Sequence, residues 1–138
     1  LLCLIAMEPP NSIDGDAIRI EKIKVLEALR PITSDKAAKN TIRAQYTSGA
    51  VEGEAVSGYL DELGHDSQAE TFVAIKAAID NWRWARVPFY LRTGKRMKDR
   101  HSEIVVQSRE TPHSMLGDTQ TQSNRLVINV QPDEGVRL

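Results

Sequence analysis

Three segments of the chain alternate apolar and polar side chains with a period of two, the pattern of a β-strand with one buried face. They are residues 71–79, 102–108 and 125–131. The linkers between them are irregular and do not supply a regular series of helices, which favours antiparallel over parallel pairing. We therefore expect the three segments to be strands of one largely antiparallel sheet.

The first third of the chain carries helical signals instead. Residues 1–8 form an apolar run that ends at Pro9 and Pro10, because proline has no backbone N–H to donate. The run has no N-cap candidate ahead of it, so we expect it to be the end of a buried helix that begins upstream. From Asp16, the expected N-cap, apolar residues recur at helical spacing until Pro31, which predicts an amphipathic surface helix.

The stretches between these elements are predicted to be less regular. Residues 32–40 are interpreted as a polar linker, residues 41–46 as a short strand, and residues 47–64 mostly as loop, because glycines interrupt them. Taken together, the patterns predict an α+β fold in which a largely antiparallel sheet is flanked by a few helices. We expect this fold to be part of a larger domain.

Charge and composition exclude several classes of protein. The 138 residues contain 18 basic and 19 acidic side chains, so no overall field favours nucleic acid or an anionic membrane. The longest apolar stretch, residues 1–7, is far shorter than the ~20 residues that a membrane-spanning helix needs. The single cysteine, Cys3, has no partner for a disulfide, which predicts a packing role and a reducing, cytoplasmic location.

The densest functional signal is residues 87–101, where an apolar, strand-like run leads into a basic loop at Gly94. Glycine lets the backbone turn at little steric cost, and several long cations around one loop can direct charge-assisted hydrogen bonds at one anion. The cations of this segment are Arg92, Lys95, Arg96, Lys98 and Arg100. On composition alone, a solvated basic loop is the favoured interpretation of the cluster. A nucleic-acid patch is disfavoured, because no series of aromatic residues is interleaved with the cations.

The other candidate residues have structural explanations. Two tryptophans close together, Trp82 and Trp84, favour packing in a core or an interface. The three histidines lack the spacing of metal ligands, so no metal site is predicted at His65, His101 or His113. Adjacent carboxylates are most often solvent-facing turn residues, and two such pairs occur: Asp61 with Glu62, and Asp133 with Glu134.

Residues 80–97 resemble, nearly residue for residue, the signature of the glucose-6-phosphate dehydrogenase family. The segment is Asp-Asn-Trp-Arg-Trp-Ala-Arg-Val-Pro-Phe-Tyr-Leu-Arg-Thr-Gly-Lys-Arg-Met. Shorter matches agree with the family in order and spacing, and they lie at residues 2–10, 21–26, 43–46, 58–60, 70–75 and 124–134. The resemblance covers essentially the whole chain and implies that residues 1–138 are part of the family's large C-terminal α+β domain.

The resemblance implies a function within the pentose phosphate pathway and glucose metabolism. The family oxidises the C1 hydroxyl of glucose 6-phosphate to 6-phosphogluconolactone and passes a hydride to NADP, and in many bacterial members also to NAD. Its dinucleotide-binding domain and the aspartate–histidine pair that acts as general base lie upstream of the matched region. We therefore expect this chain to contain no catalytic residue and to be inactive as an oxidoreductase on its own.

Three residues correspond to family positions at the substrate. Lys95 matches the lysine of the family's Arg-Thr-Gly-Lys motif, and Arg100 matches a second cation five positions on, the expected phosphate contact. Gln131, before Pro-Asp-Glu, resembles a position near the sugar in some members. The resemblance thus implies substrate binding by Lys95, Arg100 and Gln131, with no metal ion.

A second nucleotide site is only partly represented. Arg92 matches one of several basic residues that hold a second, structural NADP in animal members. The other corresponding positions are occupied by His101, Val105 and Asn129, so the basic set is incomplete.

The family resemblance also implies a homo-oligomer, because the family's sheet faces a second subunit. The alternative from a different class of function is a non-catalytic oligomerisation or anion-binding module, in which the basic loop is merely solvated. Neither interpretation involves nucleic acid or a membrane as a partner.

Overall fold

The structure is a computed structural model that describes residues 1–51, 53–109 and 123–138. It contains two compact units, Leu1–Arg96 and Met97–Leu138. Both units are built around antiparallel sheets, and the helices of the described residues all lie in the first. The α+β prediction is therefore confirmed.

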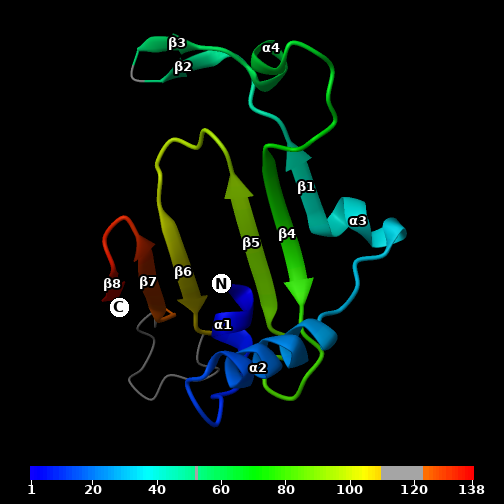
Figure 1. Cartoon of the computed structure of the whole chain (residues 1–138), viewed down its shortest axis with the longest axis vertical. Coiled ribbons are helices and arrows are strands. Elements are labelled where there is room, and N and C mark those ends of the chain that lie inside the picture. Colours follow the sequence, from blue (N-terminus) through cyan, green and yellow to red (C-terminus); the bar gives the residue numbers. More distant parts are fainter. Residues whose placement is uncertain (52, 110–122) are drawn as a thin grey trace, which may run out of the picture. The chain divides into compact units, whose positions relative to one another are not determined.

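A three-stranded antiparallel sheet in the order β1-β4-β5 forms the centre of the first unit (Figure 1). Its strands are β1 (Thr41–Ala44), β4 (Phe72–Ala78) and β5 (Pro88–Gly94). The predicted strand at residues 71–79 is confirmed to within one residue at each end. Its most buried members are Thr71, Ala77 and Ile79, and all three lie on the face that the alternation predicted.

Helices α1 (Leu2–Ala6) and α2 (Gly15–Glu27) pack against each other near the end of the sheet at which β4 finishes (Figure 1). Asp14, and not the predicted Asp16, is the N-cap of α2. The Asp14 backbone is extended, and its carboxylate accepts hydrogen bonds from the N–H groups of Asp16 (3.1 Å) and Ala17 (2.9 Å). Asp16 lies inside the first turn, where a carboxylate still interacts favourably with the helix dipole.

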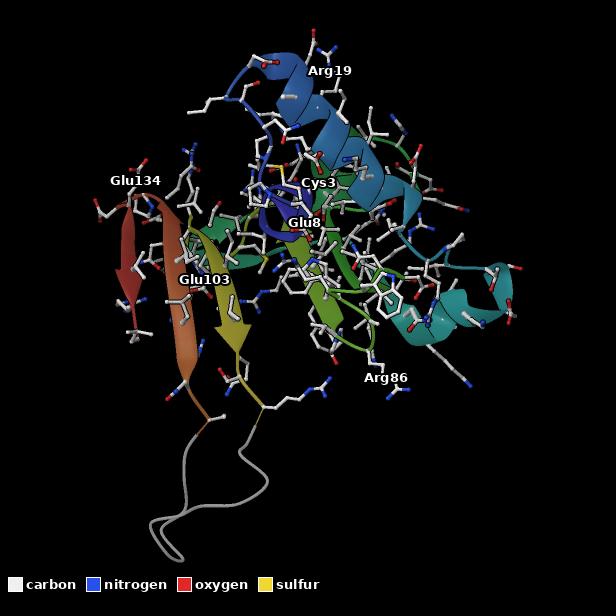
Figure 2. The ribbon with its side chains drawn as sticks, turned by 90° about the horizontal axis from the view of Figure 1, so that it is seen from below. Cys3, Glu8, Arg19, Arg86, Glu103 and Glu134 are labelled. Atoms are coloured by element: carbon white, nitrogen blue, oxygen red, sulfur yellow. The ribbon has the colours of Figure 1, made fainter. Side chains whose placement is uncertain are left out.

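The core of the first unit is small and joins the two helices to the sheet. Ala6, Val25 and Ile79 are fully buried at its centre. The partly buried side chains around them include Trp84 and Cys3, which Figure 2 labels on α1. The packing role predicted for Cys3 is therefore confirmed.

The two tryptophans differ. The Trp84 indole N–H donates to the Ala6 carbonyl at 2.9 Å, and its ring meets Phe89 edge to face at 5.2 Å, so its predicted core role is confirmed. Trp82 is fully exposed, and a core role for it is wrong. Its remaining option, packing in an interface, stays a prediction.

Several short elements occur where linker and loop were predicted. They are α3 (Ser34–Asn40), the hairpin of β2 (Gly49–Val51) and β3 (Glu54–Val56), and α4 (Tyr59–Leu63). None of these elements contains a buried residue among those described, so no apolar periodicity marks them in the sequence. They are stabilised locally instead, as at the end of α4, where Gly64 adopts the left-handed conformation (φ 74°).

The second unit is a three-stranded antiparallel sheet in the order β6-β7-β8 (Figure 1). Its strands are β6 (Ser102–Gln107), β7 (Arg125–Gln131) and β8 (Gly135–Arg137). The strands predicted at residues 102–108 and 125–131 are confirmed. The expectation that they share one sheet with β4 is wrong, because β4 pairs only with β1 and β5 among the described residues. None of the helices in the described ranges is long and apolar enough to cross a membrane.

Candidate functional site

Lys95 directly follows β5, at the point where the predicted basic loop begins. Its backbone N–H donates to the Thr71 carbonyl at 2.8 Å, which fixes its main chain at the end of the sheet. Its side chain is exposed and forms no hydrogen bond or ion pair with the residues that the structure describes. Lys95 is therefore a solvent-facing cation on a fixed backbone, and its ammonium group is able to donate charge-assisted hydrogen bonds to an anion.

Thr71 links this position to the rest of the sheet. It is the buried polar residue of the described chain, 7% exposed. Its hydroxyl accepts the Tyr46 N–H at 2.9 Å, and its own N–H donates to the Ala44 carbonyl at 2.9 Å. The start of β4, the end of β1 and the residue after β5 are thereby joined through the backbone and the hydroxyl of one residue.

Arg96, the next residue, is engaged within the first unit. Its guanidinium forms an ion pair with the Glu62 carboxylate on α4 and lies 5.2 Å from the centroid of the Tyr46 ring. The Tyr46 hydroxyl donates to Glu62 at 2.7 Å, and this hydrogen bond raises the pKa of Tyr46 above its ordinary value. Arg96 is thus a structural cation, and the adjacent Lys95 is not.

The carboxylates of α4 also have structural partners. Asp61 accepts the Gly58 N–H at 3.0 Å, at the start of the helix. The prediction that Asp61 and Glu62 are turn residues is wrong, because both lie on α4. For Asp133 and Glu134 the prediction is confirmed, since both are exposed between β7 and β8.

Arg100 and Arg92 are exposed on different units. Arg92 lies on β5, opposite Ala74 of β4, in the first unit. Arg100 lies in the second unit, two residues before β6. Lys95 belongs to the first unit, so a common anion site for Lys95 and Arg100 stays a prediction.

Gln131 ends β7 and lines a shallow hollow of ≈ 290 Å³ in the second unit. His101 and Asn129 line it too, and Arg137 reaches Asn129 with a hydrogen bond of 3.4 Å. The acidic side of the hollow includes Glu103, which Figure 2 shows on β6. The hollow is therefore polar and of mixed charge. It brings together Gln131 and two of the positions that correspond to the second nucleotide site of animal members.

Two charged residues in the first part of the 80–97 segment, Asp80 and Arg83, form ion pairs that hold the fold together. Arg30 Nε donates to the Asp80 carboxylate at 2.9 Å, and Arg83 Nε donates to the Glu8 carboxylate at 2.6 Å. Each guanidinium lowers the pKa of its partner carboxyl, mainly through its hydrogen bond and to a smaller extent through its charge. Asp80 and Arg83 therefore stabilise the loop before β5. Lys95, near the end of the 80–97 segment, remains the candidate ligand.

Metal binding has no supporting geometry in the described ranges. No three of their His, Cys, Asp and Glu residues are grouped so that they could hold an ion. His113 lies outside the described residues.

Comparison with known proteins decides the family. A sequence model described as "Glucose-6-phosphate dehydrogenase, C-terminal domain" matches residues 1–138. The chain belongs to the glucose-6-phosphate dehydrogenase family. The family resemblance of the signature segment is thereby confirmed.

Individual relatives agree with this assignment. The chain is 55% identical over 140 residues to a glucose-6-phosphate 1-dehydrogenase of Rhizobium meliloti, and the match covers 99% of this chain and 28% of that protein. It is 55% identical over 138 residues to that of Gluconobacter oxydans, covering 100% of this chain and 28% of the relative. The chain therefore spans less than a third of the length of these curated relatives.

Solved structures show the same fold. A glucose-6-phosphate dehydrogenase in complex with its substrate glucose-6-phosphate superposes with a TM-score of 0.81 at 37% identity, over 98% of this chain and 27% of that one. The glucose-6-phosphate 1-dehydrogenase of Mycobacterium avium gives a TM-score of 0.79 at 31% identity, over 99% of this chain and 28% of that one.

The sequence analysis missed three residues near the candidate ligand. Thr71 bonds to the Lys95 backbone, and Tyr46 and Glu62 contact the neighbouring Arg96. Tyr46 and Glu62 lie within or beside two of the shorter family matches, residues 43–46 and 58–60. No periodicity links them to Lys95, because their contacts depend on the antiparallel pairing of β1 with β4 and on the position of α4.

Proposed function

We propose that this chain is part of an enzyme that oxidises glucose 6-phosphate to 6-phosphogluconolactone with NADP. In that enzyme it supplies Lys95, Arg100 and Gln131 to the substrate site. The observation that carries the proposal is the family match over all 138 residues, which includes the lysine that directly follows the glycine of the signature. The side chain of Lys95, which is exposed and has no hydrogen-bond or ion-pair partner among the described residues, supports the assignment.

The chemistry is divided between this chain and the remainder of the enzyme. A hydride acceptor and a general base are needed to oxidise an alcohol, and we assign both to the preceding domain, which also binds most of the NADP. The side chains of this region contribute binding energy at the phosphate and the sugar. Arg92 alone is a weak basis for a second NADP site, because His101, Val105 and Asn129 supply no permanent positive charge.

The surroundings of the enzyme follow from the same assignment. We assign it to the cytoplasm, where the pentose phosphate pathway operates. We also infer a homo-oligomer that pairs through its sheets. The outer strands of the described sheets, β1 and β5 in one and β6 and β8 in the other, support this inference, because an outer strand carries unpaired backbone groups.

The test is steady-state kinetics of the full-length parent enzyme with Arg100→Ala, Arg100→Lys and Lys95→Ala. A charge-assisted hydrogen bond contributes about 1.5–3 kcal/mol, so each alanine variant should raise KM for glucose 6-phosphate about 10- to 150-fold. Phosphate is held remotely from the reacting carbon, so Arg100→Ala should change kcat little. Arg100→Lys should recover part of the loss, because lysine keeps the charge and loses the planar two-donor geometry.

Lys98→Ala is the matched control, since it removes one exposed cation from the same segment. It should leave both KM values within about twofold. In the substrate-site variants, KM for the nucleotide should also hold, because the dinucleotide lies on another domain. Unchanged kinetics in both Lys95→Ala and Arg100→Ala would return the segment to the solvated basic loop that composition allows.

A further inference from the structure

Lys95 lies between two fixed points of the first unit. On one side its N–H is bonded to Thr71, a buried residue whose hydroxyl caps the Tyr46 N–H. On the other side, Arg96 is held by Glu62 and the ring of Tyr46. Tyr46 takes part in both sets of contacts, so the two fixed points belong to one connected network.

The backbone at Arg96 has an uncommon conformation. Its φ of 51° lies in the left-handed region, which costs a non-glycine residue free energy unless its surroundings hold it there. The contacts that hold it come from α4 and from the end of β1, both distant in sequence. They therefore hold the main chain directly after Lys95, as the Thr71 carbonyl holds the Lys95 N–H.

The same contacts separate the roles of two adjacent cations. The Glu62 carboxylate compensates the charge of Arg96, and the Tyr46 hydroxyl occupies the other oxygen of that carboxylate. Lys95 has no acidic partner among the described residues. An arriving dianion therefore meets one uncompensated cation at this position instead of two competing ones.

We propose that Tyr46, Glu62 and Arg96, here called the Arg96 clamp, are positioning residues that orient Lys95 toward the phosphorylated sugar. The clamp makes no contact with the substrate itself and acts only through Lys95. This inference rests on the proposed function, because it needs Lys95 to be a substrate ligand.

A double-mutant cycle in the full-length parent enzyme tests the clamp. The variants are Glu62→Ala, Lys95→Ala and the two combined, and the readouts are KM for glucose 6-phosphate, KM for the nucleotide, and Tm. Residues that act as one unit show an interaction free energy in such cycles. Glu62→Ala alone should therefore raise the KM for glucose 6-phosphate about 5-fold or more. In the Lys95→Ala background the same substitution should have no further effect, and the nucleotide KM should stay unchanged throughout.

Glu54→Ala serves as the control, since it removes an exposed carboxylate from β3 without touching the clamp. Tyr46→Phe provides a second, milder perturbation that removes only the hydroxyl bonded to Glu62. If Glu62→Ala does not yield folded enzyme, the cycle of Tyr46→Phe with Lys95→Ala decides the question by the same criterion of non-additivity.

The outcomes separate this inference from the proposed function. If Lys95→Ala raises KM while the clamp variants do not, the clamp is overturned and the proposed function stands. If the clamp variants raise KM equally with and without Lys95, they act independently of it, and the clamp is again overturned. If Lys95→Ala itself has no effect, the assignment of Lys95 to the substrate site fails first.

Discussion

At Arg86 we expect glycine to give a more stable fold than alanine, the reverse of the usual order. Arg86 ends the turn between β4 and β5 with a φ of 67°, and Figure 2 labels its side chain there. Backbone hydrogen bonds hold the turn: the Ala85 N–H donates to the Asn81 carbonyl at 2.9 Å, and the Val87 N–H donates to the Trp84 carbonyl at 3.0 Å. In this conformation a Cβ atom is unfavourable, so glycine is the preferred residue.

The comparison that isolates the backbone is Arg86→Gly against Arg86→Ala. Both variants lose the interactions of the Arg86 side chain, so these losses cancel in the difference. The left-handed conformation costs an L-residue about 1–2 kcal/mol, and the greater freedom of glycine in the unfolded chain offsets about 0.5–1 kcal/mol of that. The glycine variant should therefore be the more stable by about 0.5–1 kcal/mol, whereas at ordinary positions alanine is the more stable.

Urea unfolding of the variants, measured in parallel, provides the assay. With an m-value of about 1–3 kcal/mol/M, the glycine midpoint should lie about 0.2–1 M above the alanine midpoint. Ala85→Gly is the matched control, because Ala85 does not have a positive φ. It should destabilise the fold in the ordinary direction. An alanine variant at position 86 as stable as the glycine variant, or more so, would refute the backbone argument.

Two further predictions concern the contacts around the core. Arg83 lowers the pKa of Glu8, so the pair stabilises the fold above the ordinary carboxyl pKa, and this contribution is lost as pH falls through the lowered, folded-state pKa. Glu8→Gln should therefore flatten the acid side of a profile of unfolding midpoint against pH, while an unchanged slope would contradict the linkage. Trp84→Phe removes the indole donor to Ala6 and part of the packing, and should lower the free energy of unfolding by about 1–3 kcal/mol. Trp82→Phe, at a fully exposed position, should change it by less than about 0.5 kcal/mol, measured by the same urea titration.

The strands that the sequence predicted, β4, β6 and β7, are those whose residues alternate between apolar and polar in the sequence. The burial follows this period most clearly at the end of β4, where Ala77 and the next-but-one residue Ile79 are buried, whereas Lys76 and Asp80 are exposed. The sequence shows no apolar periodicity in the short elements α3, β2, β3 and α4, because they bury no described side chain. Their conformations depend on local hydrogen bonds and on positive-φ glycines. Because glycine-rich loops have the same features, the sequence does not distinguish these elements from loops.

The sequence patterns also do not predict which strands belong to the same sheet. Alternation identifies a strand and its buried face, but it does not name the strand's neighbour. Residues 71–79, 102–108 and 125–131 have equivalent patterns, yet β4 pairs with β5, and β6 pairs with β7. Pairing follows from connections and register, which the patterns leave undetermined.

The candidate site shows the same division between what a motif identifies and what only the fold can supply. The signature of residues 80–97 identifies Lys95 but gives Arg96, its neighbour, the same chemical description. The structure distinguishes the two cations, because only Arg96 meets a carboxylate and an aromatic ring contributed by segments 34 and 50 residues away in sequence. A basic cluster read from sequence is therefore an upper bound on the cations available to a ligand. The number left free is set by the acidic partners that the tertiary structure brings to each one. Of Lys95 and Arg96, only Lys95 has no acidic partner among the described residues.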